Sequence, residues 1–230
     1  MYLNPKWILV EFLRSRLTDP RARAEDSNTE NFTATSGQTE FVLTPDTSLS
    51  CIVSVTDNGT DMHKWRDYYI DLRNNKIIFH SGRTEGNTIS VEYKQGSTNW
   101  IYPDKPLKTL SESAFPRIDV LLISGTGIRL GQYENNIESS FLFQIDVWTK
   151  EKTENQIFTI NGNKYAGENL ADYLSWKIIH SIEDYEEDLH PALYDAIIRQ
   201  VPRDLPFNTE YRAHHKVIEV ELSGIKSGRI

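Results

Sequence analysis

The stretch FLFQIDVW, residues 141–148, decides the fold, because its apolar residues alternate with a second set of side chains. One set is Phe141, Phe143, Ile145 and Val147, and the other is Leu142, Gln144, Asp146 and Trp148. Successive side chains of a strand point to opposite faces of the sheet, so the alternation predicts a half-buried β-strand. Upstream, RIDVLLI at residues 117–123 predicts another strand, and the glycine-rich residues 125–131 between them predict a long hairpin loop.

A helix is expected near the N-terminus. Asn4 is a good N-cap, and Pro5 suits the first helical position, where the missing N–H would lack a partner in any case. Apolar residues follow at helical spacing: Ile8, Leu9, Phe12, Leu13 and Leu17. The pattern predicts a helix over residues 5–17.

A longer helix is expected in the C-terminal half. Apolar residues recur there at every fourth position: Leu170, Leu174, Ile178 and Ile182. This spacing predicts an amphipathic helix over residues 167–189. Pro191 is expected to end it or to start a short second helix through Ile198, and Pro202 and Pro206 to lie in the loop that follows.

Residues 32–98 predict a separate all-β unit. Short runs rich in β-branched and aromatic residues are divided by turn signals such as Asp57-Asn58-Gly59. This spacing is typical of a small antiparallel sandwich or barrel. Residues 19–31 contain no large apolar side chain and are expected to be a linker.

The order of these elements predicts an α+β fold. The N-terminal helix, the long C-terminal helix and the last strand, which is expected over residues 217–222, have no separate core of their own. The simplest arrangement packs both helices against a mixed or antiparallel sheet, with the β-unit inserted as a sandwich-like domain. We therefore expect residues 1–18 and 99–230 to form one α+β core, with the linker at 19–31 and the inserted domain at 32–98.

Composition narrows the classes of function. The net charge is −8, whereas proteins that neutralise nucleic-acid phosphates are usually basic. No stretch approaches 18 apolar residues, so no membrane span is expected, and the chain should fold in a cytoplasm. The single cysteine, Cys51, can form neither an internal disulfide nor a thiolate zinc site, and its apolar neighbours predict that it is buried.

No catalytic, cofactor or metal site is predicted. Gly125-Thr126-Gly127 follows an apolar strand as a dinucleotide fingerprint would, but the spacing differs from G-x-G-x-x-G and the following Asn135-Asn136 does not favour a helix. His214 and His215 are neighbours on a strand and would point to opposite faces, so the two side chains would not bind one metal ion together. A nucleophile elbow, G-x-S-x-G, is not present. We therefore expect a non-enzymatic protein.

Two resemblances suggest a structural role. Residues 32–41, 53–56, 65–71, 77–79 and 89–93 resemble the small β-sandwich modules of tailed-phage structural proteins. The remainder resembles tail-terminator and tail-completion proteins, above all in FPRIDV at residues 115–120 and FQIDVWTK at residues 143–150. The inserted β-unit departs from compact terminators, so another head–tail connector, such as a head-closure or stopper protein, stays an alternative.

The resemblance implies a virion protein that is assembled in the host cytoplasm. Its subunits would form a ring, as a hexamer, that ends the tail tube and joins the tail to the head. The implied partners are further copies of the chain, the tail tube protein and a head-closure or connector protein, while DNA passes through the lumen without sequence-specific binding.

The loop around residues 125–132 and the strand at 141–148 are expected near subunit contacts, because a hairpin and a strand edge can pair with a neighbouring subunit. The residues predicted at this interface are Gly125, Thr126, Gly127, Arg129, Gln132, Phe143, Asp146 and Trp148. Two other functions remain open. A carbohydrate-binding or adhesion module would require exposed aromatic residues on one face of the β-unit, and a nucleotide-using enzyme would require a helix directly after Gly127.

Overall fold

A computed structural model describes residues 5–64, 66–71, 74–96, 99–105, 110–129, 137–151, 153–185, 189, 193–209 and 212–226. Over these residues the fold is α+β, with two α-helices and mostly antiparallel sheets. Contacts divide the chain into two compact units. Unit 1 comprises Met1–Arg21 and Trp100–Ile230, and unit 2 comprises Ala22–Asn99.

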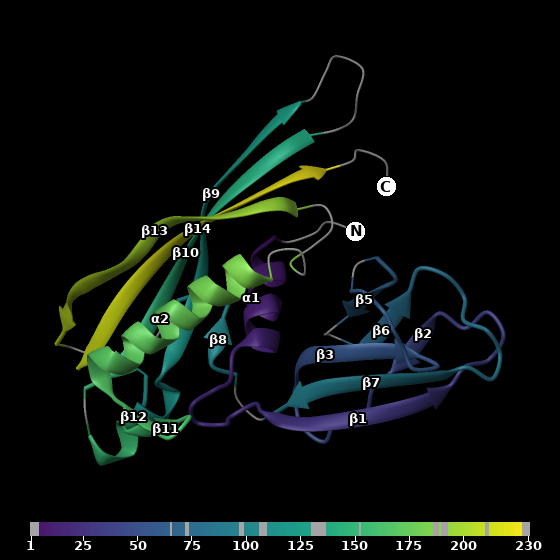
Figure 1. The fold of residues 1–230 in the computed structure, drawn as a ribbon, viewed down its shortest axis with the longest axis horizontal. Helices are drawn as coiled ribbons and strands as arrows, with labels where there is room; N and C mark the ends of the chain where they lie inside the picture. The colour runs from purple at the N-terminus through teal and green to yellow at the C-terminus, as the bar shows by residue number, and fades with distance from the viewer. Residues whose placement is uncertain are drawn as a thin grey trace. The chain divides into compact units, whose positions relative to one another are not determined.

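The main element of unit 1 is a five-stranded sheet in the order β13-β14-β10-β9-β8 (Figure 1). Its strands are β8 (Ile101–Tyr102), β9 (Arg117–Arg129), β10 (Ile137–Lys150), β13 (Leu193–Asn208) and β14 (Ala213–Lys226). Every pairing is antiparallel except that of β8 with β9. The expected strand at residues 141–148 thus lies within β10, at the centre of the sheet.

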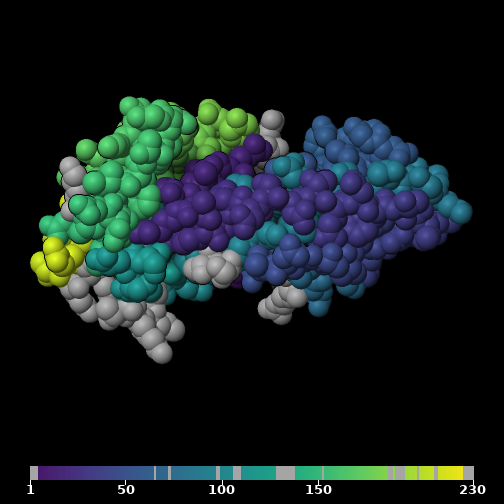
Figure 2. Space-filling model, turned by 90° about the horizontal axis from the view of Figure 1, so that it is seen from below, coloured from purple at the N-terminus to yellow at the C-terminus, as the bar shows by residue number. Residues whose placement is uncertain are grey.

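Two helices pack against this sheet. α1 (Pro5–Arg16) contacts β8 and β9, whereas α2 (Gly167–Asp184) contacts β10, β13 and β14. The apolar stripe predicted for α2 is buried: Leu170, Leu174, Ile178 and Ile182. Figure 2 shows α1 in purple beside α2 in green, and the two helices are in contact.

The ends of the helices differ little from the prediction at α1 and more at α2. α2 ends at Asp184 rather than residue 189, because Tyr185 has left the helical region, with φ −137° and ψ 29°.

Smaller elements complete unit 1. They are the 3₁₀ turns η1 (Glu112–Ala114) and η2 (Glu154–Gln156) and the hairpin of β11 (Phe158–Ile160) and β12 (Asn163–Tyr165).

β13 corrects the prediction for residues 193–208. Of the two alternatives at Pro191, a short helix through Ile198 is wrong, and so is a loop around Pro202 and Pro206, because the whole stretch is a strand that pairs with β14. β13 lies at the edge of the sheet, and both prolines fall at register shifts, where they pair with no residue of β14. Proline is compatible with a strand at such positions, because no ladder hydrogen bond requires its missing N–H.

Unit 2 consists of two sheets, in the orders β1-β7-β3-β4 and β2-β6-β5. The strands are β1 (Asp26–Thr33), β2 (Glu40–Val42), β3 (Leu49–Asp57), β4 (Thr60–Asp61), β5 (Tyr68–Asp71), β6 (Lys76–Phe79) and β7 (Thr88–Gln95). The turn predicted at Asn58-Gly59 joins β3 to β4, with φ values of 49° and 78°. Asn and Gly tolerate such positive φ better than other residues do.

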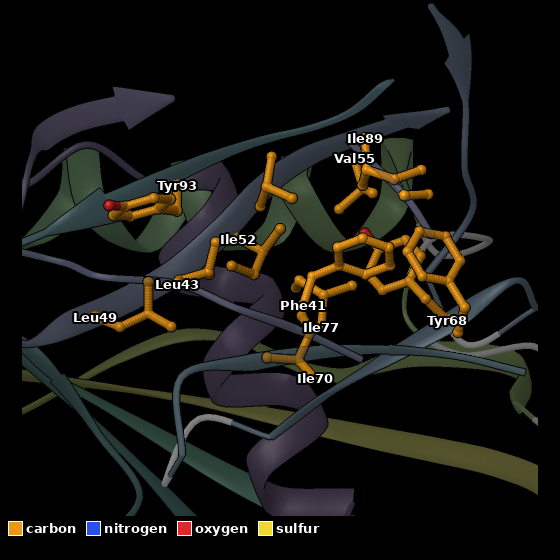
Figure 3. Close-up of a cluster of buried hydrophobic side chains, with 13 residues drawn as sticks. Phe41, Leu43, Leu49, Ile52, Val55, Tyr68, Ile70, Ile77, Ile89 and Tyr93 are labelled. Atoms are coloured by element: carbon orange, nitrogen blue, oxygen red, sulfur yellow. The ribbon is translucent and has the colours of Figure 1, made fainter. Parts of the chain in front are cut away.

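Both sheets of unit 2 contribute to one hydrophobic core (Figure 3). The ring of Phe41 lies 5.6 Å from the rings of both Phe32 and Phe79. The ring of Tyr68 lies 5.8 Å from that of Phe79. Cys51 of β3 is fully buried, as its apolar neighbours predicted.

The linker predicted at residues 19–31 is wrong from Asp26 onward. Residues 26–31 belong to β1, which pairs with β7 along its whole length. None of the side chains of β1 is fully buried, so hydropathy could not reveal the strand. Its polar side chains bond instead: the Tyr93 hydroxyl of β7 donates to Glu30 at 2.6 Å and accepts from the Asn28 amide at 2.9 Å.

We predict that Phe41→Ala destabilises unit 2 by about 3–5 kcal/mol, because it opens a cavity among the aromatic rings of the core. Chemical denaturation followed by tryptophan fluorescence and circular dichroism would measure the loss. Val42→Ala is the matched control, since the neighbouring Val42 is 50% exposed, and we expect it to change stability by less than about 0.5 kcal/mol. Equal effects of the two variants would contradict the assignment of this core.

Candidate functional site

The predicted interface residues that the structure describes fall on two adjacent strands, β9 and β10. Gly125, Thr126 and Gly127 are exposed, but they lie within β9 and not in a loop. They pair with residues 139–141 of β10, and the strand continues through Arg129. The prediction of a loop was wrong here because glycine-rich sequence usually marks a turn, whereas in this hairpin it is paired with β10. Gln132 lies outside the described residues.

Strand β9 also decides whether Gly125-Thr126-Gly127 has the geometry of a dinucleotide-binding fingerprint. Such a site needs a helix that opens at the glycines, so that backbone N–H groups can meet a pyrophosphate. β9 instead continues directly after Gly127 as far as Arg129. The glycines therefore do not have the geometry of that motif.

Gly125 has a packing role in the hairpin. A Cβ atom at this position would lie 3.1 Å from the ring of Phe141, its partner on β10. A cross-strand aromatic residue that covers a glycine is a recognised way to pin the register of a sheet. Gly125 thus allows the ring of Phe141 to lie close to the backbone of β9.

Among the described residues, the outer edge of β9 is paired with another strand over only a short part of its length. β8 covers β9 only at Ile118 and Asp119, and beyond Asp119 no described strand pairs with that edge. A register shift opposite Leu142 and Phe143 makes Ile123 the extra residue of a β-bulge. Leu122 is 46% exposed and Ile123 is 52% exposed. We call these two side chains the edge patch.

Phe143 and Asp146 do not belong to an exposed interface. Both side chains are fully buried within the subunit. Phe143 lies in the apolar alternation of β10, and Asp146 lies on the opposite face of that strand. Their side chains are therefore not available on the subunit surface, and the expectation that this strand lies near a subunit contact stays a prediction.

A buried charged cluster surrounds Asp146. His215 Nε2 lies 2.9 Å from Asp146 Oδ1, and the Gln144 amide donates to the same oxygen at 2.6 Å. Lys105 Nζ lies 3.2 Å from Asp146 Oδ2. The ring of Trp148 stacks on that of His215, with 3.6 Å between the centroids. Trp148, another predicted interface residue, thus packs inside this cluster.

A second carboxylate lies beside the first. Asp119 of β9 pairs directly with Asp146 in the strand register and is also fully buried. The Arg117 guanidinium donates to Asp119 at 2.5 Å and to the backbone oxygen of Asp104 at 3.1 Å. Arg117 also lies over the ring of Tyr102, 3.8 Å from its centroid. Two carboxylates and their cations thus share one face of the sheet.

The two carboxylates differ in acidity. Burial raises the pKa of Asp119 to about 7, against the opposing effect of Arg117, and the charge of Asp146 raises it further. Burial also raises the pKa of Asp146, but hydrogen bonds from His215 and Gln144 and the charges of His215 and Lys105 outweigh it, so that its net pKa is lowered. Near neutral pH, Asp119 therefore exchanges a proton while Asp146 stays ionised.

Sequence reasoning named Asp146 and Trp148 but missed Arg117, Asp119 and His215. A signal was present, because Arg117 and Asp119 alternate in one predicted strand as Asp146 and Trp148 do in the next. Only the register shows that the two pairs are opposite each other. His214 and His215 do point to opposite faces, as predicted: His215 contacts Trp148, whereas His214 packs against Phe207.

A shallow groove of about 450 Å³ lies on the outer face of α2 and β12. The rings of Tyr165 and Tyr173 are 4.5 Å apart, and those of Trp176 and His180 are 6.1 Å apart. Lys177 lies on the same wall. We call this feature the aromatic groove. Sequence reasoning missed it because only the fold brings Tyr165 beside the helix.

Within the described parts of the chain, no group of three or more His, Cys, Asp or Glu side chains is placed to hold a metal ion. Neither of the described helices is long and apolar enough to cross a membrane. No protein-family model, curated protein or solved structure matches the chain.

We predict that Asp119 makes the stability of unit 1 depend on pH. Its pKa rises from 3.8 to about 7 on folding, so the folded state binds this proton more tightly than the unfolded state does. Its contribution to stability is therefore fully present below pH 4 and is lost as pH rises through 7. In that window the loss approaches about 1.4 kcal/mol per pH unit for one proton.

Asp119→Asn should flatten this dependence in denaturation curves measured between pH 4 and pH 8. Asp61→Asn, on exposed β4 of unit 2, is the control and should keep the wild-type profile. An Asp119→Asn profile that follows the wild type would show that Asp119 is ionised throughout this range.

Proposed function

We propose that this chain is a virion structural protein of a tailed phage, which forms a ring that terminates the tail tube and joins the tail to the head. In this proposal, unit 1 is the terminator-like core, with α1 and α2 packed on its sheet. Unit 2 is an inserted sandwich-like module. The resemblance of strands β9 and β10 to tail-terminator proteins suggests the family, and the structure adds an independent argument for self-assembly.

The observation that carries the proposal is the open edge of β9. An unpaired edge presents N–H and C=O groups that can pair with another chain, and monomeric proteins usually blunt such edges with proline, charge or a cover. Residues 120–127 contain neither proline nor a charged residue. The edge patch adds exposed apolar surface beside these groups.

The opposite edge of the sheet is different. β13 carries Pro202 and Pro206, and its register with β14 is irregular at several points. Both features protect an edge against pairing. One edge of the sheet is thus protected and the other is not, which favours a specific contact at β9 over indiscriminate association.

The charge of the protein fits a channel for DNA. With a net charge of −8, the chain as a whole repels the phosphate backbone rather than retaining it. A ring through which DNA passes benefits from this property. A head-closure or stopper protein would share it, and that neighbouring position in the neck stays the second candidate.

The carbohydrate-binding alternative finds less support in unit 2. It requires aromatic side chains exposed on one face of the β-unit. Tyr68, Phe79 and Tyr93 are instead buried, at 3%, 2% and 0% exposure. These three side chains build the core and cannot stack on a sugar, whereas Tyr69 is only partly buried and Trp65 lies outside the described residues.

Native mass spectrometry of the purified protein, alone and with the tail tube protein of the same virus, tests the proposal. We expect a species near six subunits, present in solution or formed on tube ends. Electron microscopy should show that added protein stops the growth of tubes. A strict monomer that ignores tubes under every condition would overturn the proposal.

A further inference from the structure

Asparagine is followed by glycine at two positions of the chain, residues 58–59 and residues 161–162. We infer that Asn161-Gly162 is a site of spontaneous deamidation, at which the side-chain amide is lost as ammonia, whereas Asn58-Gly59 is protected from the same reaction. The reactants are the chain itself and water. The inference does not depend on the proposed function, because both turns and their contacts are properties of the folded subunit.

The two turns match in backbone geometry. Asn58-Gly59 forms the short loop between β3 and β4, and Asn161-Gly162 forms the loop between β11 and β12. The φ values are 49° and 78° in the first turn, and 49° and 79° in the second. All four residues are exposed, and nothing lies within 4 Å of the place that a Cβ atom would take at either glycine. A difference in reactivity must therefore come from the asparagine side chains.

Deamidation begins with the backbone nitrogen that follows the asparagine. The Gly162 nitrogen gives its proton to a base in the solvent and bonds to Cγ of Asn161. The Cγ–Nδ2 bond then breaks, and Nδ2 takes up a proton from the solvent and leaves as ammonia, so that a cyclic imide is formed without oxidation or reduction. Water opens the imide at one of its two carbonyl carbons, which gives aspartate or isoaspartate. Glycine favours the attack because it has no side chain to obstruct it.

Hydrogen bonds hold both ends of the Asn58 amide. Nδ2 donates to Asn87 Oδ1 at 2.9 Å, and Oδ1 accepts from the backbone nitrogen of Thr88 at 2.7 Å. The backbone nitrogen of Asn58 also donates to the Thr88 carbonyl at 2.9 Å. Asn87 is itself fixed, because its amide donates to Asp57 Oδ1 at 2.7 Å. Asn58 must release these side-chain bonds before its Cγ can meet the next backbone nitrogen, and this requirement slows the reaction.

The Asn161 side chain has no comparable restraint. Among the residues that the structure describes, no hydrogen bond or ion pair involves its amide. Its hairpin is also less supported, since β11 and β12 pair only with each other, whereas β3 also pairs with β7. A two-stranded hairpin is only marginally stable, so its tip opens readily. The amide of Asn161 can therefore rotate onto the Gly162 nitrogen.

The isoaspartate product alters the backbone of the hairpin. Its main chain runs through Cγ, so an additional carbon atom enters a loop whose length sets the pairing of Ile160 with Asn163. β12 contacts α2, and the ring of Tyr165 lies 4.5 Å from that of Tyr173 on the helix. A changed loop disturbs the register that places Tyr165 there. We therefore expect the modified hairpin to loosen from α2.

Peptide mapping by mass spectrometry, on the folded full chain aged in mildly alkaline buffer, tests the inference. Trypsin releases Asn161 within the peptide of residues 153–164, and fragmentation of that peptide locates the exchange of an amide for an acid. We expect Asn161 to react faster than Asn58 by about ten-fold or more, because Asn58 must first release its hydrogen bonds. In denaturant, where these contacts are lost, the two sites should react at similar rates.

Two variants provide matched controls. Asn161→Gly keeps a residue that tolerates positive φ but removes the amide, so the reaction at this turn should be abolished. Asn87→Ala removes the acceptor of the Asn58 amide and should raise the rate at Asn58 by about five-fold, while the rate at Asn161 stays unchanged. A folded wild type in which Asn58 reacts as fast as Asn161, or in which neither reacts, would overturn the inference. An Asn87→Ala chain without faster reaction at Asn58 would do the same.

Hydrogen exchange tests the consequence for the hairpin. Backbone amides of residues 158–165 should exchange faster in aged wild type than in fresh protein, because the isoaspartate loop disturbs their pairing. Aged Asn161→Gly should exchange at the rate of the fresh protein. Aged wild type that contains isoaspartate at residue 161 and still exchanges at the fresh rate would contradict the loosening from α2.

Discussion

Strand β10 pairs with β14 along its whole length and with β9 from Ile137 to Trp148, and the rest of unit 1 depends on this double pairing. The register sends Phe143, Ile145 and Val147 to one face and Asp146 to the other. A slip of one residue would exchange these faces, placing a carboxylate in an apolar core and three large apolar side chains among charges. Because that exchange would cost free energy, the register of β10 is strongly specified.

The charged cluster makes the register still more specific. Asp119 and Asp146 can both be buried only because Arg117, His215, Gln144 and Lys105 are placed to meet them. Burial of an ion is costly unless its partners are in position, so the cluster tolerates few other arrangements of β9, β10 and β14. We expect the cluster to contribute to the specificity of the sheet more than to its overall stability.

The two edges of the same sheet differ in how far they are protected against pairing. Prolines and irregular pairing protect β13, whereas β9 extends beyond the short β8, where no strand of the described residues pairs with it. The groove on α2 arises because the helix is covered by the sheet on one side only, while the β11–β12 hairpin brings Tyr165 to its outer side. Both candidate surfaces thus follow from the layout of unit 1.

Sequence by itself determined the features that depend on local periodicity and backbone preference. Alternation in β10, the four-residue spacing in α2 and the Asn58-Gly59 turn each concern neighbours along the chain, so they could be predicted. The same holds for the general α+β class. The strand at residues 193–208 was missed because its prolines are acceptable only at a sheet edge, and the position of an edge is not a local property.

Only the tertiary structure decided the rest. β1 has no buried side chain, and it forms a strand because its backbone pairs with β7. The residue types at positions 26–31 do not predict this pairing. The pairing of Asp119 with Asp146 and the stacking of Trp148 on His215 join residues from different strands. Such contacts between distant segments are set by register and packing, and for that physical reason a pattern of residue types cannot specify them.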